Sequence, residues 1–388
     1  MKRIAILVET ALASGRSILA GISEYVHERD DWSVFHPTGY LGATEPGGLE
    51  QWDGDGIIAR ISGTRVLESV RLKNVPVVDV LGNVPACPYP IIKSDDRAIG
   101  RMAAEHFIES GHHHFAFLGL EDERWSLDRE EAFLETVRHR ARQTSSFHLN
   151  ADEKRAGHWN ENVHHMVEWL EPLPRPLGLM VASDQFGPMA MKACQRMGLL
   201  VPEEISVVGV DNDQPFCDLC RPRLSSIEPD HVKVGYEAAR LLDRMISGET
   251  VSIRQVETSP LTLHRRPSTD ATAVNDPTLV KALQYIRESA CLGISVDAVA
   301  REAGLSRSVL QRRFQEHLGR TVGESLQATK LRRARDMLTF TELPLAEVAE
   351  RSGFNYQEYL TYVFKKHLGT TPARYRANTR ELARDSLT

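Results

Sequence analysis

The feature that most constrains this chain is a short pattern near its C-terminal end that occurs twice. The first copy covers residues 295–321 and the second covers residues 344–371. When they are aligned on Gly304 and Gly353, their apolar positions and a closing His-Leu-Gly agree, with one residue inserted in the second copy. A single match to so short a pattern is weak. Two agreeing copies predict one structural unit that is used twice.

Each copy predicts two short helices joined by a sharp turn. Val296, Val299 and Ala300 follow the i, i+3, i+4 spacing of one buried helical face. Gly304 supplies a left-handed residue that ends the helix, and Ser306 suits the N-cap of the next one. The matching residues of the second copy are Leu345, Val348, Ala349, Gly353 and Asn355. This is the pattern of a helix-turn-helix, whose second helix can enter a DNA major groove.

The distribution of charge supports a nucleic-acid partner. The 388 residues carry a net charge of −6, which taken alone argues against DNA binding. Residues 276–388, however, hold 18 basic and 13 acidic side chains, which leaves 29 basic and 40 acidic ones for the rest. A basic part with repeated helix-turn-helix units is the expected footprint of a DNA-binding module on a body with another task. The alternative is a merely solvated helical domain.

The first 265 residues alternate strand-like and helix-like segments. Apolar runs of strand length lie at residues 3–8, 56–61, 75–81, 115–120, 178–182 and 205–210. Amphipathic helical stretches lie at residues 17–27, 98–110, 130–140, 187–197 and 234–246. This alternation predicts an α/β fold with parallel sheets covered on both faces, and the number of strands favours two lobes. Ligands of such folds bind beyond the carboxyl ends of the strands, here in the cleft between the lobes.

The N-terminal apolar run, the cysteines and the histidine cluster are further candidates for a targeting, redox or metal-binding role. The apolar run at the N-terminus ends at Glu9, so it suits a buried strand better than a signal peptide, and no apolar run is long enough to span a membrane. Without a signal, the five cysteines should stay reduced in a cytoplasm. Cys217 and Cys220 form one CxxC without a second pair, and His112, His113 and His114 lack defined metal partners. No phosphate-binding loop or catalytic set is recognisable, so we expect no enzyme, no cofactor and no metal.

The amino-acid sequence of the first 265 residues resembles the sugar-binding core of lactose/galactose-type repressors, which share the periplasmic binding protein fold. The resemblance rests on residues 95–120, 183–212 and 223–248, and it extends over about residues 1–265. Its central piece has a Ser-Asp pair after one strand, Val201-Pro202 before the next, and Asp211 at that strand's end. The amino-terminal DNA-binding headpiece of those repressors has no counterpart in this sequence.

The resemblance implies which residues hold a sugar. Asp184 and Asp211 would lie at strand ends facing the cleft, and Arg129 matches an arginine that holds sugar hydroxyls. Arg16, in the first loop, should line the cleft, and Trp125 could stack on a sugar face. Carboxylates that accept and a guanidinium that donates suit a polyol. The alternatives are that Asp211 only caps a helix and that Trp125 is a core residue.

The remaining chain divides into a linker and a helical domain. Residues 266–278 are polar and poor in apolar side chains, which predicts a linker between a 1–265 sensor and a 279–388 domain with helix-turn-helix units at 295–317 and 344–367. Residues 324–340 predict a longer helix between the two units. A helical spacer of some 15 residues is about 22 Å long. It could place two recognition helices in successive major grooves about 34 Å apart.

Residues 279–377 resemble the DNA-binding domain of AraC-family transcription activators. The strongest match is the signature over residues 353–376, although Leu360 stands where an aromatic residue is commoner. The matching base-reading positions are Ser308, Gln311 and Arg312 in the first helix, and Gln357, Glu358, Thr361 and Tyr362 in the second. The expected phosphate contacts are Arg307, Arg313, Lys365 and Lys366. The alternative for the basic set is a solvated helix face.

A sugar-binding body joined to an AraC-type module resembles bacterial regulators of pentose operons. The resemblance implies a cytoplasmic, nucleoid-associated activator that binds double-stranded promoter or operator DNA, responds to a pentose such as D-xylose, forms a homodimer and acts with RNA polymerase. A regulator of the same build for another sugar, or a repressor, is the alternative. A sugar-modifying enzyme is a third possibility that lacks a catalytic pair.

Overall fold

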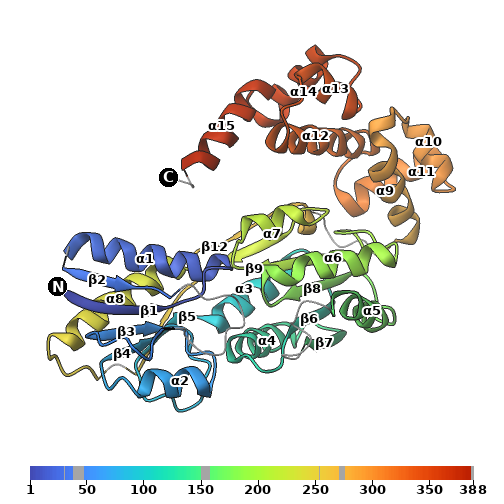
Figure 1. Ribbon diagram of the computed structural model, residues 1–388. Helices are drawn as coiled ribbons and strands as arrows, with labels where there is room; N and C mark the ends of the chain where they lie inside the picture. The colour runs from blue at the N-terminus through green and yellow to red at the C-terminus, as the bar shows by residue number, and fades with distance from the viewer. Residues whose placement is uncertain (30, 38–47, 150–157, 253, 271–275, 386–388) are drawn as a thin grey trace. The chain divides into compact units, whose positions relative to one another are not determined.

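The computed structural model describes residues 1–29, 31–37, 48–149, 158–252, 254–270 and 276–385, with side chains described as far as residue 378. The chain divides into two compact units, Met1–Ala273 and Val274–Thr388 (Figure 1). No helix among the described residues is both long enough and apolar enough to cross a membrane.

The first unit contains two six-stranded sheets, one in each of two lobes. In spatial order, the first sheet is β11 (Gln255–Thr258), β5 (Ile91–Ser94), β4 (Val77–Asp79), β3 (Gly56–Ala59), β1 (Lys2–Leu7) and β2 (Trp32–Phe35). The second is β12 (Thr262–His264), β10 (Ser225–Glu228), β9 (Ile205–Val210), β8 (Leu177–Val181), β6 (His114–Leu120) and β7 (Gln143–Leu149). Every strand pair is parallel except β10 with β12.

Helices cover both faces of each sheet (Figure 1). The first lobe has α1 (Ala13–Arg29), α2 (Thr64–Arg71) and α8 (His231–Ile246). The second has α3 (Asp96–Glu109), α4 (Arg124–Val137), α5 (Trp159–Leu170), α6 (Gly187–Arg196) and α7 (Gln214–Leu219). Central strands such as β3 and β9 are buried at every residue, which explains their unbroken apolar runs. The expected two-lobed α/β architecture is confirmed.

The chain crosses between the lobes three times, after β5, after β10 and after β11. The crossing segments are hydrogen-bonded to one another: Asp95 N donates to Thr258 O (2.8 Å), and Leu261 N donates to Glu228 O (2.8 Å). The lobes are therefore joined by three adjacent segments rather than by one flexible connection. Strand ends of both sheets contribute residues to a common cavity at this junction.

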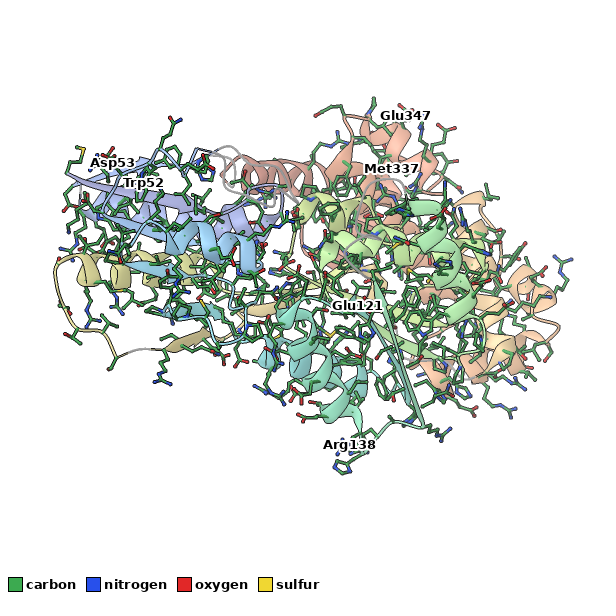
Figure 2. The ribbon with its side chains drawn as sticks, turned by 60° about the horizontal axis from the view of Figure 1, so that its bottom comes forward. Trp52, Asp53, Glu121, Arg138, Met337 and Glu347 are labelled. Carbon is green, nitrogen blue, oxygen red and sulfur yellow. The ribbon has the colours of Figure 1, made fainter. Side chains whose placement is uncertain are left out.

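The second unit is entirely helical. Its helices are α9 (Pro277–Ser289), α10 (Val296–Glu302), α11 (Arg307–Leu318), α12 (Val322–Phe340), α13 (Leu345–Arg351), α14 (Gln357–Leu368) and α15 (Pro372–Asp385). One apolar core joins α9, α10 and α11 to the first part of α12, and a second joins the rest of α12 to α13, α14 and α15. Met337 on α12 belongs to the second core, and Glu347 lies on α13 (both labelled in Figure 2).

The helix α12 connects the two helix-turn-helix units because it serves both cores. Val322 and Leu326 pack in the first core, while Leu331 and Leu338 pack in the second. The helix has 19 residues, slightly more than expected, and a helix of that length spans about 28 Å. A capping box between Thr321 and the third residue of the helix fixes where it begins.

The turns of the two units follow the expected pattern with one exception. Gly304 and Gly353 have φ values of 69° and 78°, so both adopt the left-handed conformation that a glycine permits. Ser306 caps α11, since its Oγ accepts from Val309 N. The expectation that Asn355 caps the second helix is wrong. The N-cap position of α14 is taken by Tyr356, whose side chain makes no capping hydrogen bond.

The expected linker over residues 266–278 is too long at its N-terminal side. Residues Pro267–Thr269 form a short 3-10 helix that belongs to the first unit. Ser268 is fully buried there, where it donates to Val207 O (2.6 Å) and accepts from Ser225 N (2.8 Å). At the other end α9 begins at Pro277, with Asp276 as its N-cap. Residues 271–275 of the expected linker lie outside the described residues.

Candidate binding cavity and nucleic-acid interface

A cavity lies where the strands of both lobes end. Its empty space is about 500 Å³ when the open mouth is included. The first lobe contributes Ser14, Arg60, Lys93, Ser94 and His231 to its lining, and the second contributes Asp96, Trp125, Arg129, Ser183, Gln185 and Asp211. Three of the five predicted ligand contacts, Trp125, Arg129 and Asp211, are therefore brought together.

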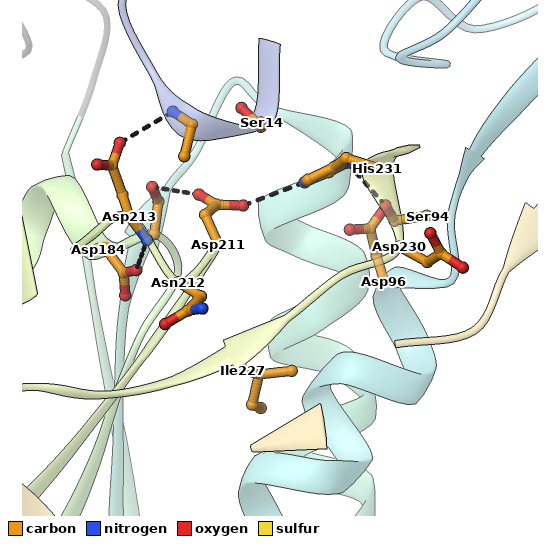
Figure 3. A network of polar contacts seen from close by, with 12 residues as sticks. Ser14, Ser94, Asp96, Asp184, Asp211, Asn212, Asp213, Ile227, Asp230 and His231 are labelled. Carbon is orange, nitrogen blue, oxygen red and sulfur yellow. Dashed lines mark hydrogen bonds and ion pairs between the residues drawn. The ribbon is translucent and has the colours of Figure 1, made fainter. Parts of the chain in front are cut away.

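Asp211 lies at the centre of a chain of polar contacts that joins the lobes (Figure 3). Its carboxylate accepts from Ser183 Oγ (2.8 Å) and from His231 Nε2 (3.4 Å), while His231 Nδ1 lies 3.2 Å from Ser94 Oγ. Burial opposes ionisation of Asp211, but the hydrogen bond from His231 and the charge of Arg129 outweigh it and lower the pKa of the carboxyl. Asp211 thus presents an ionised acceptor to the cavity. It does not cap a helix, because the helix after it, α7, has Asp213 as its N-cap.

Arg129 is held rigidly at the cavity. Its Nε donates to Asp96 Oδ1 (2.9 Å) and one terminal nitrogen donates to Ala182 O (2.6 Å). The guanidinium carbon lies 4.7 Å from the ring centroid of Trp125, whose indole N–H donates to Glu123 (3.0 Å). Trp125 packs against the core of the second lobe and also lines the cavity. Such an indole offers a flat apolar surface beside fixed donors and acceptors.

A buried ion network beside Arg129 was not predicted from the sequence. Lys93 lies 3.3 Å from Asp96 and 3.1 Å from Asp128, and its side chain is only 7% exposed. Burial alone would lower the pKa of Lys93, but the charges of Asp96 and Asp128 outweigh it and raise that pKa. The charges around the cavity are thus paired with one another. A lining of this kind presents hydrogen-bond donors and acceptors without a large net charge, which suits a neutral polyhydroxy ligand.

The structure does not place Asp184 in the lining of the cavity. The chain turns into a 3-10 helix, Asp184–Phe186, directly after Ser183, so Ser183 and Gln185 reach the cavity while Asp184 points into the lobe. The buried carboxyl accepts from Asp213 N (2.8 Å) and Ser226 Oγ (2.8 Å). Burial, and then the charge of Asp211, raise its pKa well above the ordinary value. Asp184 thus holds Asp213 and Ser226 in place from inside the second lobe, without lining the cavity itself.

Arg16 is also outside the cavity lining. Its guanidinium donates to the carbonyls of Thr10 and Ala11 (2.9 Å each) and lies 3.5 Å from Asp213. The carbonyl contacts fix the first loop to the start of α1, and the contact with Asp213 ties α1 to the second lobe. Arg60, which no motif singled out, occupies the cavity and donates to Glu9 (2.8 Å).

The residues that the sequence analysis missed share one signal. Lys93, Ser94 and Asp96 lie at the end of β5 and the start of α3, and His231 begins α8 directly after β10. Each is a polar residue at a strand-to-helix junction, where side chains gather at the carboxyl edge of a parallel sheet. Two of the three segments that cross between the lobes, those after β5 and β10, begin at such junctions, whereas the third joins β11 to β12. Neither β5 nor β10 is among the strands expected from the sequence, because both are short and contain polar residues, so these strand ends could not be located from apolar runs alone.

The cysteine and histidine motifs have structural roles. All five cysteines are free, and the Cys217 thiol donates to Asp184 (3.3 Å). Burial lowers the pKa of His112 to about 4, so its imidazole is neutral, with Nδ1 3.2 Å from Phe107 O. Over the described parts of the chain, no group of three or more potential ligand side chains could hold a metal ion.

The first recognition helix, α11, exposes three of its five predicted contact residues. Arg307, Ser308 and Arg312 are exposed and Gln311 is half-buried. Arg312 is 69% exposed and lies 3.9 Å from Glu316. Arg313 instead donates to Asp276 at the N-cap of α9 (2.8 Å) and its side chain is half-buried. The structure therefore gives Arg313 a role inside the domain in place of a free phosphate-binding surface.

The second recognition helix, α14, is less polar. Gln357, Glu358 and Tyr362 are exposed, while the Thr361 hydroxyl donates to Gln357 O (3.0 Å). The ring of Tyr362 stacks on that of Tyr359, with centroids 6.3 Å apart. Lys365 and Lys366 are exposed in the last turn.

A two-lobed α/β sensor with a polar cavity, followed by two helix-turn-helix units, defines a ligand-responsive DNA-binding transcription regulator. Family models match in the same order: an XylR N-terminal domain over residues 3–93, a periplasmic binding protein-like domain over 104–269 and a helix-turn-helix domain over 299–378.

Relatives match along almost the whole chain. The xylose operon regulatory protein of Escherichia coli K12 is 31% identical over 96% of both chains, and that of Haemophilus influenzae is 30% identical over 97% of this chain and 98% of its own. The solved structure of the xylose-binding transcription activator XylR has a TM-score of 0.82, at 31% identity, and covers 97% of this chain and 98% of that one. The chain belongs to the family of xylose operon regulatory proteins. It is therefore a sugar-sensing, AraC-type transcription regulator and not an enzyme.

Proposed function

We propose that this chain is a D-xylose-dependent activator of pentose catabolic genes, which acts in the bacterial cytoplasm on nucleoid DNA as a homodimer and with RNA polymerase. The observation that carries the proposal is the cavity. Asp211 offers an ionised acceptor and Arg129 a fixed donor, and Trp125 supplies a flat ring beside them. The similarity to xylose operon regulatory proteins and to a xylose-binding transcription activator adds D-xylose as the proposed effector.

The mechanism follows from where the cavity residues lie. His231 and Ser94 belong to the first lobe and Asp211 and Arg129 to the second, so a sugar held by both sets favours the closed arrangement of the lobes. A sugar can shift this equilibrium only by its difference in affinity between the open and closed forms. The free energy from that difference is what changes the affinity of the helix-turn-helix unit for DNA.

Titration calorimetry of the full chain tests the choice of effector. We expect D-xylose to bind at least tenfold more tightly than L-arabinose, D-ribose, D-glucose or cellobiose. A site that hydrogen-bonds each hydroxyl rejects a sugar that leaves one of its buried groups unpaired, at a cost of about 1–3 kcal/mol per group.

Tighter binding of another sugar in this panel would show a regulator of the same build with a different effector. The direction of regulation is decided separately, by transcription in vitro with purified RNA polymerase. Repression of the target promoter by the sugar-bound protein would contradict the activator assignment and leave the effector assignment intact.

A further inference from the structure

The two recognition helices differ at the positions that would enter DNA. Both have 12 residues, and each buries a leucine and a phenylalanine at the same positions, Leu310 and Phe314 in α11 and Leu360 and Phe364 in α14. The helices therefore align residue by residue. In this alignment Ser308, Gln311 and Arg312 correspond to Glu358, Thr361 and Tyr362. Where α11 exposes a guanidinium, α14 exposes a phenol.

Tyr362 is part of a larger exposed surface. Tyr356, Tyr359 and Tyr362 are 71%, 52% and 59% exposed, and we call this set the tyrosine face. The rings of Tyr359 and Tyr362 are stacked at an interplanar angle of 17°, and Tyr359 also meets the buried Phe354 edge-on at 6.0 Å. The rings of Tyr359 and Tyr362 support one another, and Phe354 anchors Tyr359 to the core of the domain.

The charge around the tyrosine face indicates what it contacts. The sequence has no lysine or arginine between Arg351 and Lys365, and Glu358 is the one acidic residue in that interval. The start of α14 thus has no cation to bind phosphate or to donate to guanine. Exposed aromatic rings at a recognition position instead fit an apolar group on a base edge. In the major groove that group is the 5-methyl of thymine.

We propose that the tyrosine face of α14 selects thymine in the second half of the operator through contact with the 5-methyl group. The proposal rests on the proposed DNA-binding function and adds which base one half of the operator contains and how that base is recognised. The first helix recognises guanine by hydrogen bonds from Arg312, and the second recognises thymine by apolar contact. The two half-sites then differ in sequence although the two units share a fold.

Thymine and deoxyuridine differ by the 5-methyl group alone, so exchanging them tests the contact directly. A duplex is selected from a random library by the full-length protein with D-xylose present, and each thymine of the half-site bound by α14 is replaced by deoxyuridine. We expect about a fourfold loss of affinity at each contacted position, because burial of one methyl-sized group contributes about 0.8 kcal/mol. Tyr362→Ala should remove this sensitivity, whereas Tyr362→Phe, which keeps the ring, should retain it.

The same replacement in the half-site bound by α11 is the internal control, and there Tyr362→Ala should change nothing. A wild-type protein that ignores all these replacements overturns the proposal, while the selected duplex would still establish DNA binding. If Tyr362→Ala leaves the methyl effect intact, the contact belongs to another residue and the proposal is also wrong. Unchanged DNA affinity with reduced transcription would assign the tyrosine face to RNA polymerase instead.

A second, independent inference concerns the end of the sensor. Arg266 is the last basic side chain of the first compact unit, which ends at Ala273. One of its terminal nitrogens donates to Asn212 Oδ1 (2.5 Å), and the other donates to Leu224 O (3.1 Å). Its backbone N donates to Ser225 Oγ (2.8 Å). Arg266 thereby fixes the exit of the chain to the residue that directly follows Asp211 of the cavity.

Asp211 and Asn212 are both held in unusual conformations. Their φ values are 104° and 49°, in the region that residues with a Cβ seldom adopt. The contacts of Asp211 with Ser183 and His231 help to hold it there. A sugar hydroxyl that bonds to the carboxylate changes those contacts, and the backbone of Asn212 responds because it is the next residue.

We infer that Arg266 is a positioning residue that transmits sugar binding from Asp211, through Asn212, to the segment that leads to the DNA-binding unit. The inference rests on the proposed sugar response. It predicts that sugar binding and DNA binding survive the loss of Arg266 while the link between them is lost.

Arg266→Gln and the neighbouring Arg265→Ala form a matched pair, since Arg265 is exposed and lies 3.5 Å from Glu109 at its nearest ion-pair contact. DNA affinity is measured with and without D-xylose in the full chain, and the ratio of the two affinities is the coupling ratio. Allosteric coupling commonly amounts to about 5- to 150-fold. We expect Arg266→Gln to reduce the coupling ratio to below about twofold. Arg265→Ala should keep the wild-type ratio, and the sugar affinity of both variants measured without DNA should remain normal.

If Arg266→Gln keeps the coupling ratio of the wild type, the inference is overturned. If D-xylose has no effect on the DNA affinity of the wild type, the proposed function is contradicted instead. If Arg266→Gln does not fold, Asn212→Gly tests the other side of the same contact, because glycine removes the side chain and accepts the positive φ of this position. Combining both substitutions should add nothing to either one, because residues that act through one contact are not additive. A purely structural role would lower stability and sugar affinity together and leave the ratio unchanged.

Discussion

Asp211→Asn should weaken D-xylose binding by about 10- to 100-fold while DNA binding without sugar stays unchanged. The low pKa of Asp211 means that the carboxylate is ionised, and a hydrogen bond to a charged group contributes about 1.5–3 kcal/mol. Asparagine keeps the shape and tolerates the positive φ of this position, so the substitution removes charge with little backbone strain. Titration calorimetry measures the sugar affinity, and a DNA-binding assay with and without sugar measures the response.

Asp184→Asn is the matched control at the end of the neighbouring strand. Its Oδ2 accepts all three hydrogen bonds, and Oδ1 has no partner, so an asparagine fits with its oxygen at Oδ2 and its NH₂ group at Oδ1. We expect normal sugar affinity in the folded protein. Equal losses for the two variants would show that Asp184 contacts the ligand after all. Normal sugar affinity in Asp211→Asn would exclude Asp211 from the site.

The difference between these two carboxylates shows where sequence reasoning stopped. Both follow buried apolar strands, and the resemblance to sugar-binding repressors assigned both to the cleft. Their orientation depends on what comes next: a 3-10 turn after Ser183 directs Asp184 inward, whereas the left-handed φ of Asp211 directs its side chain to the cavity. Neither conformation is encoded in an apolar pattern, because each is stabilised by residues distant in sequence.

Contacts across long sequence separations account for the other differences. Arg313 has the spacing of an exposed residue, yet its partner Asp276 lies 37 residues earlier and draws it away from the surface. Lys93 stands in an apolar strand, and it is tolerated there because Asp96 and Asp128 come from other elements to neutralise it. By contrast the central strands β1, β3, β4, β6, β8 and β9, most of the sheet-covering helices and the duplicated helix-turn-helix could be predicted, since periodicity and capping are local. The strands on either side of them (β2, β5, β7, β10, β11 and β12) have no long apolar run and were not predicted.

The sequence predicts where the DNA-contacting surface lies more readily than which bases that surface recognises. The duplication located both recognition helices. Arg312 falls on the face opposite the buried Leu310 and Phe314, and the half-buried Gln311 lies at the edge of that face. What each helix recognises depends on the side chains that it exposes and on which of them are already engaged. In α11 that comparison leaves Arg312 as the strongest candidate for base recognition.

Arg312→Ala should reduce specific DNA affinity by about 5- to 150-fold, because a bidentate arginine–guanine pair contributes about 1–3 kcal/mol of discrimination. Arg312 is well exposed, with one ion-pair contact at 3.9 Å, to Glu316, so its guanidinium is available to DNA. Binding is measured on the selected operator and on the same duplex with the contacted guanine replaced by adenine. The wild type should discriminate between the two, and Arg312→Ala should bind them equally.

Two further variants separate base recognition from electrostatic attraction. Arg312→Lys keeps the charge but loses the planar fork, so it should preserve the salt dependence of binding and lose most of the preference for guanine. Arg313→Ala should instead lower the stability of the helical unit, because its contact with Asp276 joins α11 to the N-cap of α9. If Arg312→Ala kept the guanine preference and only flattened the salt dependence, Arg312 would be a phosphate contact and the base-reading role would pass to Gln311 or Ser308.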